Sequence, residues 1–277
     1  MRLSGAPSVH TVGTVTTDLF DAAAMYDEDY LHFFAVSGPA GAPTHGPVVG
    51  TAYAGASAAA DVVWRLLELQ PGMSVLDLAC GHGALANSLA MRGCRVTGLD
   101  SSEVFLDRAR ADAAAMAAEV EYVSGDMREL PSWTGRFDRV VNWSTAFGYF
   151  DDAVNRTVLA EMARVLRRGG RMAMDLDSLP RFLMSYTPSR VTATRDNGDM
   201  LVDRHQLDPL TGRFQVERTV IRDGHARRLT FVKRLFAFPE LRDWCVASGF
   251  TGVAGYGEDG LPLHTDHHRM IVVAELP

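Results

Sequence analysis

The sequence has few cysteines, a single lysine and no long apolar segment. Its three cysteines are irregularly spaced and form no C-x-x-C pair, which argues against a disulfide framework and against a zinc site. Lys233 is the only lysine, so the Tyr-x-x-x-Lys pair of many hydride-transfer enzymes is missing. No run of about 18 apolar residues occurs, and the N-terminus lacks an apolar signal-peptide core. We therefore expect a cytoplasmic protein that does not insert into a membrane.

Charge and composition narrow the expected partners. The chain of 277 residues carries 27 basic and 34 acidic side chains, a formal net charge of −7, and 47% of its residues are hydrophobic. A protein with this balance has no overall field that attracts nucleic acid or an anionic membrane. We expect a small-molecule partner, no nucleic acid, and one large α/β domain with a smaller appended unit. Homo-oligomer formation is compatible with this composition.

The middle of the chain alternates between short apolar runs and helical patterns. The apolar runs cover residues 75–78, 95–99, 121–126, 137–143 and 171–177. Because parallel neighbouring strands need helical crossovers, this alternation predicts an α/β fold with a doubly wound, mostly parallel, Rossmann-like sheet. Before the sheet, residues 18–34 are predicted to form one helix with five aromatic residues.

The pattern changes between Arg190 and Arg234, where period-two stretches are separated by Asn-Gly, Pro-Leu-Thr-Gly and Asp-Gly turn signals. This predicts an antiparallel sheet inserted after the fifth strand. The segment carries ten basic and six acidic residues, and two interpretations are open: a solvated sheet face, or a lid that binds an anion. The predicted domains are an N-terminal arm and aromatic helix (1–56), a Rossmann-like core (57–184 and 236–277) and an antiparallel β insertion (185–235).

A glycine-rich stretch, "SVLDLACGHGALA", spans residues 74–86. Gly81, Gly83 and Ala86 satisfy the G-x-G-x-x-G/A spacing of dinucleotide-binding loops, in which a diphosphate lies on the N-terminus of the next helix. Asp77 would put a carboxylate beside that anion. The same carboxylate suits a cationic ligand, such as a sulfonium nucleoside with an ammonium group. The loop therefore favours S-adenosylmethionine over NAD, and its glycines allow the backbone to approach the ligand closely.

Two further strand ends carry aspartates. Asp100 ends the second apolar run, where a carboxylate can accept both ribose hydroxyls of either NAD or S-adenosylmethionine. Asp126 and Met127 end the third run. An aspartate there can accept a hydrogen bond from the adenine amino group while the thioether packs on the ring. Since ligands of open α/β sheets bind at the carboxyl ends of the strands, these motifs predict one site for an adenosyl ligand.

Residues 60–277 resemble a class I S-adenosylmethionine-dependent methyltransferase. The stretches "VLDLACGHG", "VTGLDSS", "GDMREL" and "LRRGGRMAMDL" are similar to the glycine-rich, ribose-binding, adenine and pre-fifth-strand motifs, in the family's order. "STAFGYF", "FAFPELRDWCVASGF" and "YGEDGLPLHTDHHRMIVVA" are similar to a bacterial branch that acts on small molecules and has an inserted antiparallel lid and a reversed C-terminal strand pair. Ala79 stands where many members have glycine.

The cofactor site is predicted from these motifs and from the resemblance. The candidate residues for binding S-adenosylmethionine are Tyr26, Asp77, Ala79, Gly81, Gly83, Asp100, Ser101, Asp126, Met127 and Asn142. The resemblance implies that an N-terminal aromatic helix closes over the cofactor, and Tyr26 and Tyr30 match that segment loosely. Packing of this helix against the core is the alternative for each tyrosine.

Methyl transfer is an in-line displacement at a sulfonium carbon, so alignment and exclusion of water are the main requirements. Residues 142–150, after the fourth run, are expected where the methyl group and its acceptor meet. The candidate catalytic residues are Tyr149 and His267, and the candidate substrate-binding residues are Tyr30, Phe147, Tyr149 and His264. Packing at the sheet edge is the alternative for both aromatic residues of the 142–150 loop. The H-x-x-H-H spacing lacks a carboxylate partner, and no metal is predicted.

The sequence thus predicts a methyltransferase that transfers a methyl group from S-adenosylmethionine to a nitrogen or oxygen of a small molecule. The resemblance points to natural-product biosynthesis, such as that of antibiotics. Two other functions stay open: an NAD-dependent oxidoreductase, and a non-catalytic protein that binds an adenosyl ligand.

Overall fold

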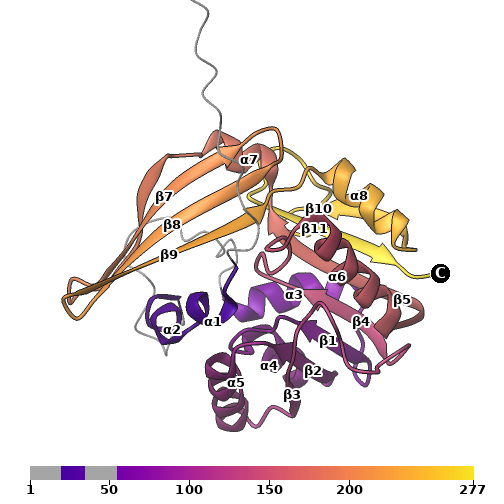
Figure 1. Cartoon of the computed structure of the whole chain (residues 1–277). Helices are drawn as coiled ribbons and strands as arrows, with labels where there is room; N and C mark the ends of the chain where they lie inside the picture. Colours follow the sequence, from indigo (N-terminus) through magenta and orange to yellow (C-terminus); the bar gives the residue numbers. More distant parts are fainter. Residues whose placement is uncertain (1–19, 35–54) are drawn as a thin grey trace, which may run out of the picture.

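The structure, a computed structural model, describes residues 20–34 and 55–277. In this part of the chain the strands form two sheets, one of seven strands and one of four (Figure 1). The predicted N-terminal arm lies outside the described residues, as does most of the segment between the aromatic helix and the core. No helix of the described part is both long and apolar enough to cross a bilayer.

The large sheet has the strand order β10-β11-β5-β4-β1-β2-β3. Its strands are β1 (Ser74–Leu78), β2 (Arg95–Asp100), β3 (Val120–Ser124), β4 (Phe137–Asn142), β5 (Leu166–Asp177), β10 (Thr251–Tyr256) and β11 (Arg269–Glu275). The first five are parallel, whereas β11 is antiparallel to β5 and β10 is antiparallel to β11. The doubly wound, mostly parallel sheet with a reversed C-terminal strand pair is thereby confirmed.

Helices cover both faces of this sheet, which explains the continuous apolar runs of the central strands. One face carries α3 (Ala56–Leu66), α4 (Ala84–Met91) and, beside α4, α5 (Glu103–Met116). The other face carries α6 (Asp152–Val165) and α8 (Phe238–Ala247). All residues of β4 are buried between these layers.

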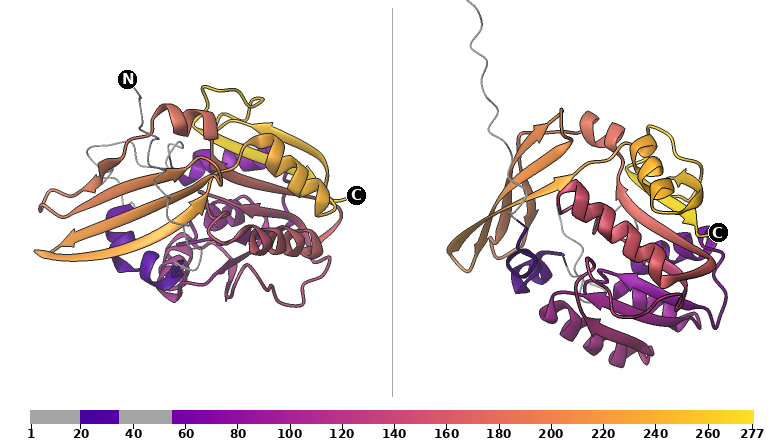
Figure 2. Two further views of the ribbon diagram at one scale, coloured as in Figure 1. Left: turned by 45° about the horizontal axis from the view of Figure 1, so that its top comes forward. Right: turned by 45° about the vertical axis from the view of Figure 1, so that its right-hand side comes forward.

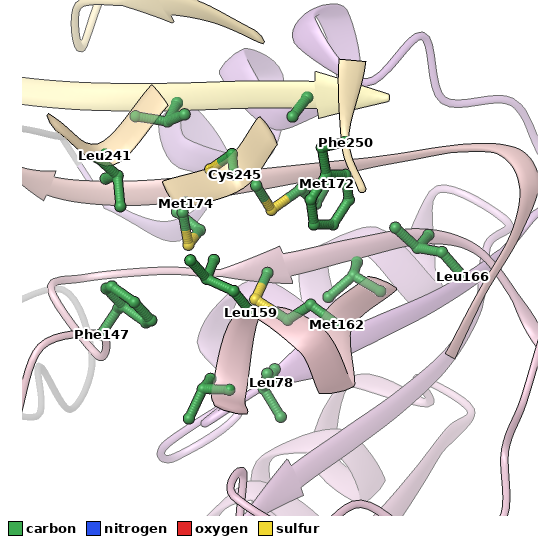
Figure 3. Close-up of a cluster of buried hydrophobic side chains, with 14 of the residues drawn as sticks. Leu78, Phe147, Leu159, Met162, Leu166, Met172, Met174, Leu241, Cys245 and Phe250 are labelled. Atoms are coloured by element: carbon green, nitrogen blue, oxygen red, sulfur yellow. The ribbon is translucent and has the colours of Figure 1, made fainter. Parts of the chain in front are cut away.

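The main core lies between β5 and the helices α6 and α8. Figure 3 shows Leu159 and Met162 of α6 and Leu241 of α8 directed toward Met172 and Met174 of β5. β5 begins already at Leu166, whereas the sequence predicted a start at residue 171. The parallel pairing of β1 to β5 brings the carboxyl ends of these strands to one edge of the sheet, and this edge carries the site.

The inserted sheet consists of β6 (Ser189–Thr194), β7 (Met200–Asp208), β8 (Arg213–Arg222) and β9 (His225–Arg234). The strands are antiparallel in sequence order, with tight turns at the Asn-Gly, Pro-Leu-Thr-Gly and Asp-Gly signals. A short helix that was not predicted, α7 (Leu179–Met184), leads into this sheet and has a proline in its first turn. Figure 1 shows the inserted sheet extending to one side of the core.

The predicted aromatic helix over residues 18–34 is wrong in one respect: it is two helices, α1 (Ala22–Met25) and α2 (Glu28–Phe34). The Asp27 carboxylate accepts hydrogen bonds from the backbone N–H groups of Asp29 and Tyr30. Aspartate stabilises a helix start by capping such free N–H groups, and this starts a second helix within the aromatic pattern.

The helices α1 and α2 lie between the inserted sheet and the core (Figure 2). Arg227 of β9 forms ion pairs with Asp27 at 2.7 Å and with Asp29 at 2.6 Å, and Arg222 of β8 contacts Asp29 at 2.9 Å. Basic residues of the inserted sheet are therefore paired with Asp27, which lies between α1 and α2, and with Asp29 of α2. Neither of the two open interpretations anticipated this arrangement. We call α1, α2 and the inserted sheet together the cover.

Candidate functional site

A cavity of about 550 Å³ lies at the carboxyl edge of the parallel strands, with α1 and α2 on its other side. Of the predicted cofactor residues, eight line this cavity: Tyr26, Asp77, Ala79, Gly81, Asp100, Ser101, Asp126 and Met127. Tyr30 and Tyr149, predicted at the substrate end, line it as well. The loops after β1, β2, β3 and β4 and the helices of the cover thus meet around one space.

The loop between β1 and α4 uses left-handed backbone at three positions: φ is 58° at Ala79, 56° at Gly81 and 78° at Gly83. Gly83 was predicted to contact the cofactor, but it does not line the cavity. A Cβ atom there would collide with the Tyr122 hydroxyl and lie 2.8 Å from the Ala109 Cβ. Gly83 therefore serves the packing of α4 against α5 and β3, and Gly81 is the glycine that faces the cavity.

Asp77 is the most unusual charged group of the cavity. Its side chain is 1% exposed, and its Oδ2 atom has no hydrogen-bond partner among the described residues. Burial, and next the nearby Asp100 carboxylate, raise the pKa of Asp77 from its usual 3.8 to about 7. A buried carboxylate without a cation is unfavourable, so this position suits a ligand that brings a positive charge.

Asp100 is held by the backbone around it. One carboxylate oxygen accepts a hydrogen bond from Gly81 N at 2.8 Å, and the other accepts one from Ser102 N at 2.9 Å. Burial raises the pKa of Asp100 in spite of these bonds. These backbone bonds fix the direction of the carboxylate, and its remaining lone pairs can accept hydrogen bonds from a ligand.

Asp126 lies at the rim, where its side chain is 42% exposed. Arg128 donates hydrogen bonds from Nε to both carboxylate oxygens, at 3.0 and 2.9 Å, and holds the pKa of Asp126 below its usual range. Asp126 is thus already paired, and Met127 beside it provides an apolar contact surface in the cavity. The adenine contact predicted for Asp126 would compete with Arg128.

Aromatic rings form much of the remaining wall. Tyr149 stacks on Phe20 with ring centroids 4.6 Å apart, and Tyr26 meets Phe105 edge to face at 5.6 Å. Burial raises the pKa of Tyr149 to about 12 and that of Tyr26 well above its usual 10. Both hydroxyls therefore keep their protons near neutral pH. The Ser102 hydroxyl donates to the Tyr26 carbonyl at 2.7 Å and links the cover to the Asp100 loop.

Two residues of the predicted site at the end of β4 are corrected by the structure. Asn142 is fully buried and donates from Nδ2 to the Leu78 carbonyl at 2.9 Å, so it joins β4 to β1 and does not line the cavity. Phe147 is 1% exposed and packs against Phe236 in the main core. Figure 3 shows Phe147 among the core side chains. The packing alternative therefore holds for Phe147, whereas Tyr149 faces the cavity.

His264 and His267 do not line the cavity either, and the structure gives no support to a catalytic role for His267. The two rings are tilted by 37° with centroids 3.7 Å apart, His267 packs on Gly257, and its Nε2 lies 3.3 Å from an Asp259 oxygen. The loop before β11 thus turns toward the end of β10 and away from the cavity. Within residues 20–34 and 55–277, no group of three or more His, Cys, Asp or Glu side chains is placed to hold a metal ion.

Some cavity residues were missed by the sequence analysis, among them Phe20, Asp21, His82 and Phe105, whereas Trp143 and Ser144 lie in the 142–150 stretch that was expected at the acceptor but were not named as candidates. Phe105 lies in the first turn of α5, directly after the Asp100 loop, and Trp143 follows β4. Their positions next to strand ends are a signal that could have indicated them. Cys80 also lines the cavity, and burial raises the pKa of its thiol well above its usual value.

The doubly wound sheet, the glycine loop after β1 and the acidic residues at the ends of β1 and β2 define a class I methyltransferase fold. Residues 75–170 match the family model described as a methyltransferase domain. This match agrees, over residues 75–170, with the resemblance stated from the motifs: this part of the chain is similar to a methyltransferase domain.

Comparison with known proteins gives relatives of this domain. A demethylmenaquinone methyltransferase of Thermotoga maritima is 36% identical over 135 residues, which are 46% of this chain and 55% of that protein. A methyltransferase structure from Streptomyces caelestis matches with a TM-score of 0.69 at 21% identity, over 80% of this chain and 95% of that one. An S-adenosylmethionine-bound amino pentose methyltransferase from Micromonospora echinaspora, involved in calicheamicin biosynthesis, matches with a TM-score of 0.60 at 23% identity, over 82% and 93%. The chain spans about half the length of the first curated relatives it matches.

Proposed function

We propose that this protein is an S-adenosylmethionine-dependent methyltransferase that acts on a small molecule. The observation that carries the proposal is Asp77, a buried carboxylate that faces the cavity with one oxygen unpartnered among the described residues. A cation in the cavity would remove the unfavourable burial of this charge. NAD would instead bring a diphosphate to the same loop, next to a carboxylate, which is unfavourable.

The residues around the cavity fit the parts of this cofactor. Asp77 would accept hydrogen bonds from the ammonium group of the methionine end, and Asp100 would accept them from the ribose hydroxyls. Met127 and Phe105 offer apolar surfaces suited to the adenine ring. When bound, S-adenosylmethionine supplies an electrophilic methyl group on a sulfonium sulfur. The protein's own task is then to orient the acceptor and to exclude water, which the aromatic wall and the cover support.

The cavity favours a nitrogen over an oxygen as the methyl acceptor. A hydroxyl acceptor needs a positioned base, whereas an amine only has to arrive uncharged. Tyr26 and Tyr149 keep their protons near neutral pH, because burial raises their pKa values. His82, whose pKa is lowered by burial, belongs to the glycine loop at the cofactor end. The Micromonospora relative, an amino pentose methyltransferase involved in calicheamicin biosynthesis, supports a role in natural-product biosynthesis.

Calorimetric titration tests the cofactor. We expect S-adenosylhomocysteine to bind with 1:1 stoichiometry and NADH not to bind. NADH binding without a response to S-adenosylhomocysteine would favour the oxidoreductase and defeat the proposal. In the same titration Asp77→Asn should bind S-adenosylhomocysteine more weakly. Its matched control is Asp138→Asn, because Asp138 is a buried carboxylate that is already paired, with Ser74 and Arg167, and does not line the cavity.

Transfer of a labelled methyl group to a panel of small amines and hydroxyl compounds tests the activity. Methylated amines are the expected products, whereas methylated hydroxyls alone would reverse the choice of acceptor atom. Binding of S-adenosylhomocysteine without transfer to any compound would favour the non-catalytic adenosyl-ligand protein. Cytoplasmic location and homo-oligomer formation stay predictions.

A further inference from the structure

The loop after β4 is held in a conformation that its residues disfavour. Ser144 and Thr145 have φ values of 58° and 61°, in the left-handed region. This region is unfavourable for residues with a Cβ atom, and especially for a β-branched residue such as threonine. Such backbone persists only where the surroundings over-determine it. The same loop supplies Trp143, Ser144 and Ala146 to the cavity wall, so its conformation shapes the cavity.

Asp175 on β5 holds both of these residues. The Ser144 N–H donates to the Asp175 Oδ2 atom at 3.0 Å, and the Thr145 N–H donates to the Asp175 carbonyl at 2.9 Å. Asp175 is fully buried. One aspartate thus fixes two consecutive amides of the loop through its side chain and its backbone.

Arg269 on β11 holds the aspartate and the loop together. Its Nε and Nη2 atoms donate to the two carboxylate oxygens of Asp175, at 2.8 and 2.9 Å. Nη2 also donates to the Thr145 hydroxyl at 2.7 Å, and Nη1 donates to the Asp177 Oδ1 atom at 2.7 Å. The arginine is 2% exposed. The planar guanidinium can satisfy three partners in fixed directions, which a lysine cannot do.

The same network reaches the cover. Lys233 of β9, the only lysine of the chain, donates from Nζ to the Asp177 Oδ2 atom and is itself buried. Asp177 thus stands between Arg269 of the core and Lys233 of the inserted sheet. The inserted sheet and the loop after β4 are therefore set relative to each other through one carboxylate.

We propose that Arg269 is a positioning residue for the acceptor end of the cavity. Through Asp175 and Thr145 it keeps the loop after β4 in its left-handed conformation, and through Asp177 it aligns this loop with the inserted sheet. The inference rests on the proposed function, because the loop matters for transfer only if the acceptor lies beside it. None of the contacts of Arg269 given above reaches Asp77 or Asp100, so we expect Arg269 to affect the acceptor end of the cavity more than cofactor binding.

Hydrogen exchange with mass spectrometry tests this proposal, with and without S-adenosylhomocysteine. The first variant is Arg269→Lys, which keeps the positive charge but loses the planar guanidinium that bonds several partners at once. The second is Thr145→Val, which removes only the hydroxyl and leaves the charged groups in place. The control is Arg171→Lys, since Arg171 bridges Glu68 and Glu275 at the opposite end of the β5–β11 pair. We expect amides of residues 143–150 to exchange about tenfold faster in the two test variants and unchanged in the control.

A second measurement separates positioning from a general structural role. The dissociation constant of S-adenosylhomocysteine should stay within about twofold of wild type. With an acceptor from the methylation panel, kcat should fall by up to about 100-fold, because small misplacement of reacting groups has effects of this size.

Two results would overturn the inference. One is unchanged exchange of residues 143–150 in both test variants; the other is equally faster exchange throughout the chain in Thr145→Val, which would indicate loss of overall stability. Should Arg269→Lys fail to fold, Thr145→Val alone decides. Failure of wild-type protein to bind S-adenosylhomocysteine would count against the proposed function, and the exchange comparison without ligand would still decide whether Arg269 holds the loop.

Discussion

The carboxyl edge of the parallel strands, with Asp77 and Asp100, forms what we call the floor of the cavity. Buried carboxylates in the floor lack a cationic partner in the described part of the chain, whereas those in the cover are paired. On the floor, burial raises the pKa of Asp77 and of Asp100, and no described cation is paired with either. In the cover, the pKa of Asp203 is lowered by Arg218, whose Nε donates to it at 2.8 Å, although Asp203 is only 1% exposed. Asp29 in the cover is likewise paired, with Arg222 and Arg227.

The difference teaches how to separate binding from structural aspartates. A paired carboxylate contributes to the folded state, and loss of its partner is strongly unfavourable. A buried carboxylate without a cation makes the empty protein less stable, so its presence indicates a ligand that brings the cation. By this criterion we propose that the floor is a binding surface, whereas the cover is held together by ion pairs.

The strongest way to break this comparison is to replace one aspartate from each region. Asp77→Asn should weaken binding of S-adenosylhomocysteine by about 100-fold, or about 3 kcal/mol, because a charged hydrogen bond to its ammonium group is lost. It should also raise the free energy of unfolding of the ligand-free protein. Asp203→Asn should lower that free energy by about 3–5 kcal/mol, since Arg218 is left buried without its partner.

Calorimetry and urea unfolding measure both quantities. The comparison would be wrong if the two variants lost stability to the same extent, or if Asp77→Asn left the affinity unchanged.

Asp100→Ala should weaken cofactor binding by about 1.5–3 kcal/mol, through loss of charged hydrogen bonds to the ribose. The substitution also removes the partner of the Gly81 N–H, so the glycine loop loses part of its support. Titration with S-adenosylhomocysteine gives the affinity. An unchanged value would remove Asp100 from the site.

The pKa of about 7 for Asp77 predicts that, as the pH rises, the ligand-free protein becomes less stable while its affinity for the cationic ligand increases. The folded-state pKa lies above the unfolded one, so this group stabilises the ligand-free protein below about pH 4 and loses that contribution as the pH rises toward 7. Binding of a cation needs the ionised form, so affinity should fall by about tenfold per unit as the pH drops below 7. Thermal unfolding between pH 5 and 8 should show a ligand-induced rise in Tm that grows with pH. In Asp77→Asn this growth should vanish; its persistence there would assign the effect to another group.

A smaller effect is expected in the cover. Arg227→Gln removes the ion pairs to Asp27 and Asp29, and S-adenosylhomocysteine should then dissociate about threefold to tenfold faster than from wild type. Because these pairs are partly exposed, the difference between variant and wild type should be smaller in high salt. Arg228→Gln is the control, as Arg228 is the exposed neighbour on β9 and has no ion pair with the described residues. Stopped-flow displacement measures the rate. Equal rates in both variants would mean that these ion pairs do not hold the cavity closed.

The smallest effect concerns Ala79, where the left-handed φ of 58° explains why glycine suits this position. Ala79→Gly should raise the free energy of unfolding by at most about 1 kcal/mol, because glycine adopts this backbone without a Cβ penalty but loses more chain entropy. Urea unfolding is the measurement. A clear loss of stability would show that the alanine methyl group has a packing role.

The parts of the site that local patterns encode were predictable. Asp77, Asp100 and Met127 each lie at or just after the end of a short apolar strand, and the parallel topology brings such ends together. The Phe147 assignment failed because the turn of its loop is set by Asp175 and Arg269, which are distant in sequence.

Periodicity could not predict the contacts of the last loop or of the cover either. His267 packs on Gly257 at the start of the same loop, a contact that no spacing rule indicates. The break in the aromatic helix, by contrast, has a local cause in Asp27, and its capping role could have been recognised.

Lys233 offers a practical consequence. As the sole lysine, buried between the inserted sheet and β5, it is the only side-chain amine that an acylating reagent can modify. Its rate of modification would report how often the sheet lifts from the core, without any engineered label.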